Sequence, residues 1–241
     1  MAVINVTSEI GKLKKVLLHR PGKELLNLTP DKLDELLFDD IPFLKVAQKE
    51  HDAFADILSK NGVEVVYLED LAAEAVSRSA EIREKFIKQY INEADIYSEY
   101  YQKMIYDFLN AIKNPKELIL KTMEGVNANE IPFKNTHSLS HYVLDSGSMI
   151  INPMPNLYFT RDPFACIGNG VSLNKMYSVT RCRETIYGEY IFDHHPEYAG
   201  KVNRFYNRYD APSIEGGDIL NIGKDVLAIG LSQRTSANAI D

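Results

Sequence analysis

Long apolar runs are missing from this sequence of 241 residues. No stretch approaches the roughly 18 apolar residues that a membrane-spanning helix needs. Residues 1–15 also lack the apolar segment of a signal peptide. These absences predict a cytoplasmic protein without a membrane partner.

Cysteine is scarce, with only Cys166 and Cys182 in the chain. The two match no paired metal-ligand spacing, and a reducing compartment would keep both as thiols, so no disulfide framework is expected. A nucleophilic cysteine needs a neighbouring base or a positive field. Cys182 lies between two arginines, but a structural role is the interpretation that we adopt for both.

Basic residues are outnumbered, with 27 lysines and arginines against 34 aspartates and glutamates, a formal charge of −7. A phosphate-binding surface needs basic stripes, which the sequence does not contain. The charge therefore argues against a nucleic-acid partner. A cationic or zwitterionic small molecule is the expected ligand class.

The chain has 45% hydrophobic residues, enough for a sizeable core. The apolar run at residues 16–18 predicts a strand, and apolar positions at helical spacing predict a helix that ends at Asn61-Gly62. The run at residues 63–68 predicts a second strand. Strand, helix and strand in this order are typical of an α/β domain.

Residues 70–125 show a helical period throughout, and Asn114-Pro115 begins one of these helices with an N-cap and a proline. After Ile150 short strands are expected again, including "NLYF" and "VSLNKMYSV", together with a helix at about residues 184–194 and a hairpin that turns at residues 223–225. We therefore divide the chain into a first segment (1–69), an inserted helical subdomain (70–148) and a further segment (149–241).

Three apolar runs, "VLLHR", "LYFTR" and "AIGLSQR", each end in arginine next to a turn. This weak repeat suggests modules that present strand ends to one centre, as a propeller does. At the C-terminus, Ser236 or Thr235 would cap a helix of only about one turn. We interpret the sequence as a truncated polypeptide.

Two carboxylates lie where the backbone is constrained. Asp162 precedes Pro163, which favours extended backbone, and Glu215 precedes Gly216-Gly217, which permit close backbone approach or a positive φ. Two preorganised carboxylates suit a guanidinium, a planar cation with five donors. Each carboxylate alone is also explained as a cap or turn residue.

Other charged residues leave alternatives open. Arg161, Arg181 and Arg234 could form ion pairs with these acids or hold the carboxylate end of an amino acid. Asp218 is interpreted as structural, bonding nearby backbone amides. His194 and His195 offer zinc ligands, but adjacent helical residues point about 100 degrees apart, so a helix C-terminus explains them without metal.

Five motifs in order, "LLFDDIPF", "NLYFTRDPF", "MYSVTRCRET", "SIEGGD" and "SQRTSANAI", closely resemble the bacterial arginine deiminases. The resemblance covers almost the whole chain. It implies the pentein fold, a five-bladed α/β propeller with a helical subdomain inserted early, here incomplete. It also implies hydrolysis of L-arginine to L-citrulline and ammonia through a covalent cysteine intermediate, without cofactor or metal.

The resemblance also assigns residues. Asp162 would hold the guanidinium, and Glu215 would bind it and assist the acid-base steps. Asn156, Arg181 and Arg234 would hold the amino and carboxylate ends of the substrate. Phe159 would pack on its aliphatic stem, and Leu37 would come from a loop that covers the site.

The family's nucleophilic cysteine and its His-x-Asp motif have no counterpart in this sequence. We therefore expect this chain alone to be inactive, because no thiolate forms the intermediate. Exposed blades of an open propeller would favour a homo-oligomer or another partner. The alternatives are a non-catalytic arginine-binding or regulatory module, a metal-dependent hydrolase, or a methylated arginine or agmatine as substrate.

Overall fold

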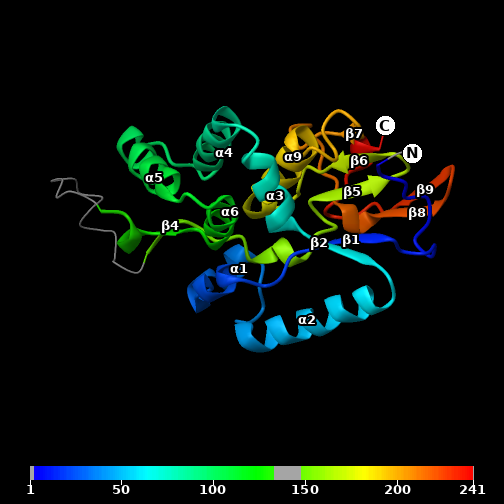
Figure 1. Cartoon of the computed structure of the whole chain (residues 1–241), viewed down its shortest axis with the longest axis horizontal. Coiled ribbons are helices and arrows are strands. Elements are labelled where there is room, and N and C mark those ends of the chain that lie inside the picture. The colour runs from blue at the N-terminus through cyan, green and yellow to red at the C-terminus, as the bar shows by residue number, and fades with distance from the viewer. Residues whose placement is uncertain (1–2, 133–147, 241) are drawn as a thin grey trace.

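The computed structural model describes residues 3–132 and 148–240, which form mixed α/β structure with several small sheets (Figure 1). The helices are α1 (Leu33–Leu36), α2 (Leu44–Lys60), α3 (Leu68–Val76), α4 (Ala80–Asn92), α5 (Glu99–Ala111), α6 (Pro115–Glu124), α8 (Val179–Cys182) and α9 (Thr185–His194). The strands are β1 (Lys15–Leu18), β2 (Glu64–Tyr67), β3 (Val126–Asn127), β4 (Met149–Ile151), β5 (Phe164–Ile167), β6 (Gly170–Leu173), β7 (Asn203–Tyr206), β8 (Ile219–Gly223) and β9 (Val226–Ile229).

The predicted opening unit is confirmed. β1 and β2 pair in parallel with Val16 opposite Val65, and α2 connects them. The helix ends at Lys60 with Asn61 as its C-cap, and Gly62 has a φ of 78°, a left-handed conformation that glycine adopts without a steric cost. The local signal at the C-terminal end of α2 thus determines where the chain reverses.

Helices α3 to α6 cover most of residues 68–124, where the periodicity predicts helices. α3 packs against both α6 and α9, and the core that they share contains fully buried Phe86, Ile105 and Leu118. Asn114 caps α6, because its side chain accepts hydrogen bonds from the backbone amides of the first turn. The expected end of a helical subdomain at residue 148 adjoins residues 133–147, which lie outside the described residues.

The expected strand "NLYF" is wrong. Residues 155–158 form a short 3-10 helix, and the N–H of Phe159 donates to the carbonyl of Asn156. Pro155 has no N–H for a strand ladder, and its fixed φ suits the first position of a helix. Arg161 therefore follows a helical turn, and the interpretation of three alike strand ends is wrong as well. "VSLNKMYSV" is a strand only to Leu173, where β6 ends.

Four separate small sheets are described: β1-β2, β3-β4, β5-β6-β7 and β8-β9. The predicted hairpin is confirmed as β8 and β9, which pair antiparallel around residues 224–225. The predicted terminal turn is a 3-10 helix capped by Ser236. Over residues 3–132 and 148–240 these sheets form no closed ring, so the observed class is mixed α/β.

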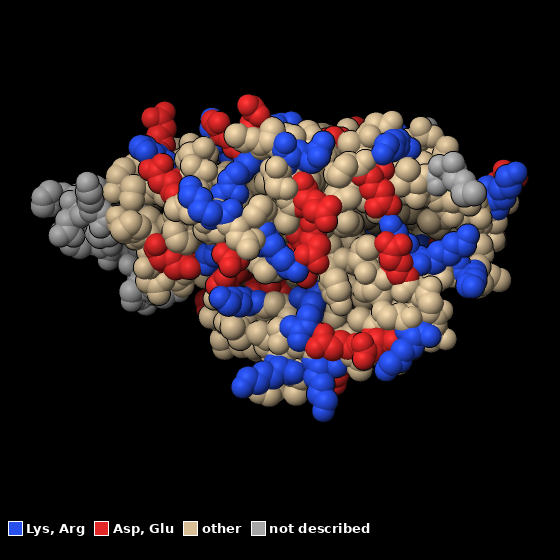
Figure 2. All heavy atoms as spheres, viewed as in Figure 1, with Lys and Arg blue, Asp and Glu red and all other residues tan. Residues whose placement is uncertain are grey.

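Charged side chains of both signs are interspersed on the face that Figure 2 shows. No helix within the described ranges is both long enough and apolar enough to cross a membrane.

An acid-base cluster is buried between the turn after β1 and α3. Nδ1 of His19 lies 2.9 Å from a carboxylate oxygen of Glu69, and Nε2 lies 3.1 Å from one of Glu24. The three side chains are at most 8% exposed. Burial opposes a charge on the ring, but the two carboxylates prevail and raise the pKa of His19 to about 9. The imidazole is thus a cation fixed between two acids.

Candidate functional site

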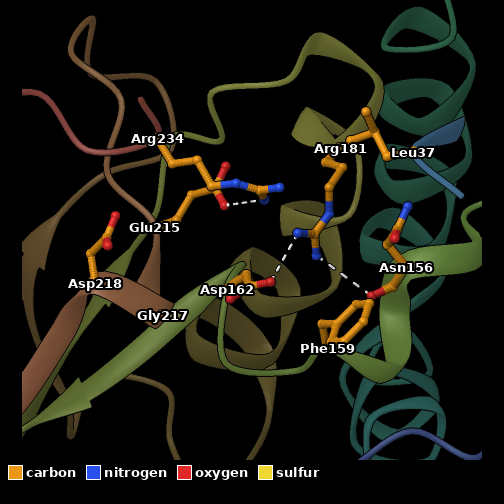
Figure 3. Close-up of a pocket in the computed structure, with 9 residues that line it drawn as sticks. All are labelled: Leu37, Asn156, Phe159, Asp162, Arg181, Glu215, Gly217, Asp218 and Arg234. Atoms are coloured by element: carbon orange, nitrogen blue, oxygen red, sulfur yellow. Dashed lines mark hydrogen bonds and ion pairs between the residues drawn. The ribbon is translucent and has the colours of Figure 1, made fainter. Parts of the chain in front are cut away.

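A cavity of about 390 Å³ opens between the 155–162 segment, α8, residues 215–218 and Arg234 (Figure 3). All seven side chains that the resemblance implicates line it, although they come from segments far apart in the sequence. Gly217 and Asp218 also line this cavity. The complete lining is Leu37, Asn156, Phe159, Asp162, Arg181, Glu215, Gly217, Asp218 and Arg234.

The two carboxylate motifs are joined through their backbones. The N–H of Gly216 donates to the carbonyl of Asp162 at 3.1 Å, and Nε of Arg161 donates to the carbonyl of Gly216 at 2.9 Å. A Cβ added at Gly216 would lie 2.0 Å from the carbonyl oxygen of Arg161. Only glycine fits this backbone contact, which we name the Gly216 seam. Of the two expectations for Gly216-Gly217, close approach is confirmed, and neither glycine has a positive φ.

Asp162 faces the cavity beside a buried arginine. One of its carboxylate oxygens accepts a hydrogen bond from Nη1 of Arg181 at 2.9 Å. The Arg181 side chain is 3% exposed, and its Nε and Nη2 lie 3.0 and 2.9 Å from one oxygen of Glu184. Arg181 is therefore held from two sides by carboxylates.

Glu184 is the functional candidate that our sequence reasoning missed. Its side chain is 2% exposed, and burial raises its pKa to about 7 against the opposing charge of Arg181. The spacing Arg181-x-x-Glu184 brings both residues to one helical face and was the available signal. Its burial depends on the tertiary structure and is not readable from the sequence.

Glu215 forms the opposite side of the cavity. Its side chain is 2% exposed, and one oxygen accepts from the N–H of Tyr177 at 3.1 Å. The other oxygen accepts from Nη1 of Arg234 at 3.0 Å. The Arg234 side chain is 50% exposed, so this ion pair borders solvent.

The remaining cavity residues form a wall around these charges. Nδ2 of Asn156 donates to the carbonyl of Leu36 at 2.9 Å and so ties down the loop that carries Leu37. Leu37 has a φ of 62°, the left-handed conformation, where α1 ends. The ring of Phe159 lies 5.9 Å from the guanidinium carbon of Arg181, within reach of a cation-π contact.

Asp218 accepts hydrogen bonds from two hydroxyl groups. Oγ of Ser232 and Oγ1 of Thr235 lie 2.7 and 2.6 Å from the same carboxylate oxygen. We expected backbone amides as partners of this carboxylate, and that detail is wrong. The two bonds connect the end of the 216–218 turn to the segment that carries Arg234.

Arg161, the third candidate arginine, lies away from the cavity. Its guanidinium pairs with Glu9 at 2.8 Å. This hydrogen-bonded ion pair lowers the pKa of Glu9 to about 2. Arg161 therefore supports the backbone of the Gly216 seam and does not line the cavity.

Neither cysteine lines the cavity. Burial raises the pKa of Cys166 to about 11 and also raises the pKa of Cys182. Sγ of Cys182 is hydrogen-bonded to backbone carbonyls, at 3.4 Å for that of Met176. Both thiols are therefore protonated near neutral pH and lack the activation that a nucleophile needs.

The adjacent histidines have separate surroundings. Nε2 of His195 lies 3.0 Å from a carboxylate oxygen of Glu74, and its Nδ1 accepts from the N–H of Glu197. His194 lies against the ring of Tyr190, with centroids 5.4 Å apart. Over the part of the chain that the structure describes, no group of three His, Cys, Asp or Glu side chains could hold a metal ion.

The cavity lining thus contains three carboxylates, one of which (Asp218) is bonded to hydroxyl groups, and two guanidinium groups. Asp162 and Glu215 offer acceptors to a planar cation, while Arg181 and Arg234 offer donors to a carboxylate. Such a set can bind a molecule that is cationic at one end and anionic at the other.

Comparison with known proteins gives consistent matches. A family model described as arginine deiminase matches residues 34–241. An arginine deiminase of Treponema denticola is 98% identical over 241 residues, which are 100% of this chain and 59% of that protein. Arginine deiminases of Streptococcus agalactiae and Streptococcus sanguinis are each 59% identical over 240 residues, 99% of this chain and 58% of theirs. The chain thus spans less than two thirds of the length of these curated relatives.

Proposed function

Because this chain belongs to the arginine deiminase family, we propose that its cavity is the arginine-binding part of a deiminase site. The reaction of the whole protein is then hydrolysis of L-arginine to L-citrulline and ammonia. The family match confirms the resemblance read from the five motifs. The observation that carries the proposal is the single cavity lined by all seven candidate residues.

Each residue has a role that fits its place. Asp162 and Glu215 hold the substrate guanidinium, and Glu215 also assists proton transfer. Arg181, Arg234 and Asn156 hold the carboxylate and amino ends. Phe159 packs on the aliphatic stem, and Leu37 covers the site.

The covalent step needs a thiolate that attacks the guanidinium carbon, so that the carbon-nitrogen bond breaks and ammonia leaves. Cys166 and Cys182 are both protonated and outside the cavity. This chain therefore binds arginine without converting it. The resemblance to the arginine deiminases implies that the thiolate comes from a cysteine late in the sequences of that family.

Two measurements test this. Calorimetric titration of the purified chain with L-arginine should show binding, and a citrulline assay should show no product. Absence of binding at millimolar arginine would contradict the proposed site. Citrulline traceable to this chain would contradict the proposed inactivity.

A non-catalytic arginine-binding module is the second candidate, because the structure contains the carboxylates but no activated thiol in the cavity. Co-expression with the part of the Treponema denticola relative that this chain does not match separates the two. Citrulline formation by the mixture supports the deiminase. Tight arginine binding without citrulline supports the module.

We also propose that the small sheets are blades of the pentein propeller, with residues 70–148 inserted between segments 1–69 and 149–241. The β8-β9 hairpin exposes Leu220, Ile222 and Val226, a surface suited to a further blade or a second copy. A homo-oligomer in the cytoplasm is the proposed state. Light scattering of the purified chain tests it, and a monomer at micromolar concentration would contradict it.

A further inference from the structure

The two arginines of the cavity are held very differently. The Arg181 side chain is 3% exposed and is bonded to two carboxylates. The Arg234 side chain is 50% exposed and pairs with Glu215 alone. Figure 3 shows the Arg181 guanidinium turned toward Asp162 and the Arg234 guanidinium turned toward Glu215.

Arg181 is fixed in place. Withdrawing it would leave Glu184, 2% exposed, as a buried carboxylate without its cation, which is a costly state. Its Nη1 would at the same time leave Asp162. This side of the cavity is therefore preformed.

Arg234 can move at little cost. Within the described residues, its guanidinium makes no hydrogen bond besides the one to Glu215. The Glu215 carboxylate stays in position without it, because its other oxygen accepts from the N–H of Tyr177. Solvent can hydrate the guanidinium as it leaves, since half of the side chain is already exposed.

Given the proposed function, a substrate guanidinium needs the Glu215 carboxylate that Arg234 occupies. We propose that Arg234 is an internal competitor that the incoming guanidinium displaces from Glu215. The displaced side chain is then the cation that pairs with the carboxylate of the same ligand. Arg234 is thereby a specificity-determining residue, because a guanidine without a carboxylate must displace it and leaves the displaced side chain without a new ion-pair partner.

The test compares L-arginine with agmatine, which has the same guanidinium and no carboxylate, by calorimetric titration of Arg234→Met. Methionine preserves much of the apolar stem and removes the charge. We expect agmatine to bind about two- to fivefold more tightly than to the unmodified chain, the range for exposed ion pairs. L-Arginine should bind about tenfold or more weakly, because a charge-assisted hydrogen bond is lost.

Two further variants serve as controls. Arg204→Met removes one arginine from an exposed ion pair with Asp193, away from the cavity, and should change neither affinity. Because Arg204→Met changes the net charge by the same amount as Arg234→Met, it controls for the general attraction of cations to a more negative protein. Arg234→Lys retains a cation at the site and should restore agmatine affinity toward that of the unmodified chain.

A second readout does not depend on how well Arg234→Met folds. The side-chain guanidinium resonances of Arg234, assigned by their loss in Arg234→Lys, should shift in the unmodified chain when agmatine saturates it. Unchanged resonances would contradict the displacement of Arg234, and so would an agmatine affinity that falls or stays constant in Arg234→Met. If the unmodified chain still binds L-arginine, the proposed function stands. If the unmodified chain binds neither guanidine, the proposed function fails and the competitor fails with it.

Discussion

Two regions of this molecule pair a cation with a buried carboxylate, and they differ in whether the cation can leave. In the His19 cluster the imidazole is 0% exposed and bonded at both nitrogens. In the candidate cavity the Arg234 side chain is 50% exposed and bonded to one carboxylate. Similar ion pairs thus form a structural joint in one region and an exchangeable contact in the other.

Both regions also border a cavity, so concavity alone does not distinguish them. Glu24 and Glu69 line a second cavity of about 560 Å³. Among the other cations that line that cavity, Arg20 pairs with Asp52 and Lys121 pairs with Glu130. What distinguishes the two regions is the cation bound to the buried carboxylates, because the His19 side chain is 0% exposed and the Arg234 side chain is 50% exposed.

The largest expected effect is on the His19 cluster. His19→Leu leaves Glu24 and Glu69 buried without their cation and should lower the free energy of unfolding by about 3–5 kcal/mol. Urea denaturation measures it. The affinity of the folded protein for arginine should be unchanged, since none of the three residues lines the candidate cavity. A loss below about 1 kcal/mol would show that the cluster is not the structural joint described here.

The same cluster predicts a pH dependence. Folding raises the pKa of His19 from 6.5 to about 9, so its contribution to stability is fully present below pH 6.5 and is lost as the pH rises through 9. The loss is on the order of 3 kcal/mol. Urea denaturation at several pH values, with His19→Gln as the comparison, measures it. Parallel curves for the two proteins would refute the assignment.

In the cavity, Asp162→Asn should weaken arginine binding about tenfold or more, because a charged acceptor for the guanidinium is lost. The free energy of unfolding should change by less than about 1 kcal/mol, since Arg181 keeps its bonds to Glu184. Calorimetry and urea denaturation report the two quantities separately. A large loss of stability with unchanged arginine affinity would show that Asp162 has a structural role, as His19 does, and no role in binding.

The smallest effect belongs to a pair outside both regions. Asp193→Asn breaks the pair with Arg204, whose side chains are 39 and 26% exposed, and should cost at most about 1 kcal/mol. Arginine affinity should be unchanged. This variant matches Asp162→Asn in chemistry, so any weakening of arginine binding here would remove the distinction between the cavity and the surface.

Local signals account for the parts of the fold that the sequence predicts correctly. Asn61-Gly62, Asn114-Pro115 and the turn at residues 223–225 act within a few residues and mark element ends as expected. The sequence wrongly predicts a strand at residues 156–159, because an apolar run is compatible with a strand and with a helical turn, and the prolines decide between them.

The candidate site was found through its motifs and not through spacing. Asp162 and Glu215 are 53 positions apart in the sequence, and their convergence depends on the Gly216 seam, which is a tertiary contact. Glu184 was missed for the same reason, since an acid three residues after an arginine is usually a surface pair. Burial converts that pair into a support for the cavity.

The Gly216 seam fixes the distance between the backbones that carry Asp162 and Glu215 through main-chain atoms. Because the peptide groups of Asp162 and Gly216 are bonded to each other, the anchor points of both acids keep their separation whatever side chains they carry. Shortening Glu215 by one methylene would thus change reach without moving the anchor. A bulkier guanidine could therefore be accommodated by changing the length of these two side chains alone, while the backbone that carries them stays in place.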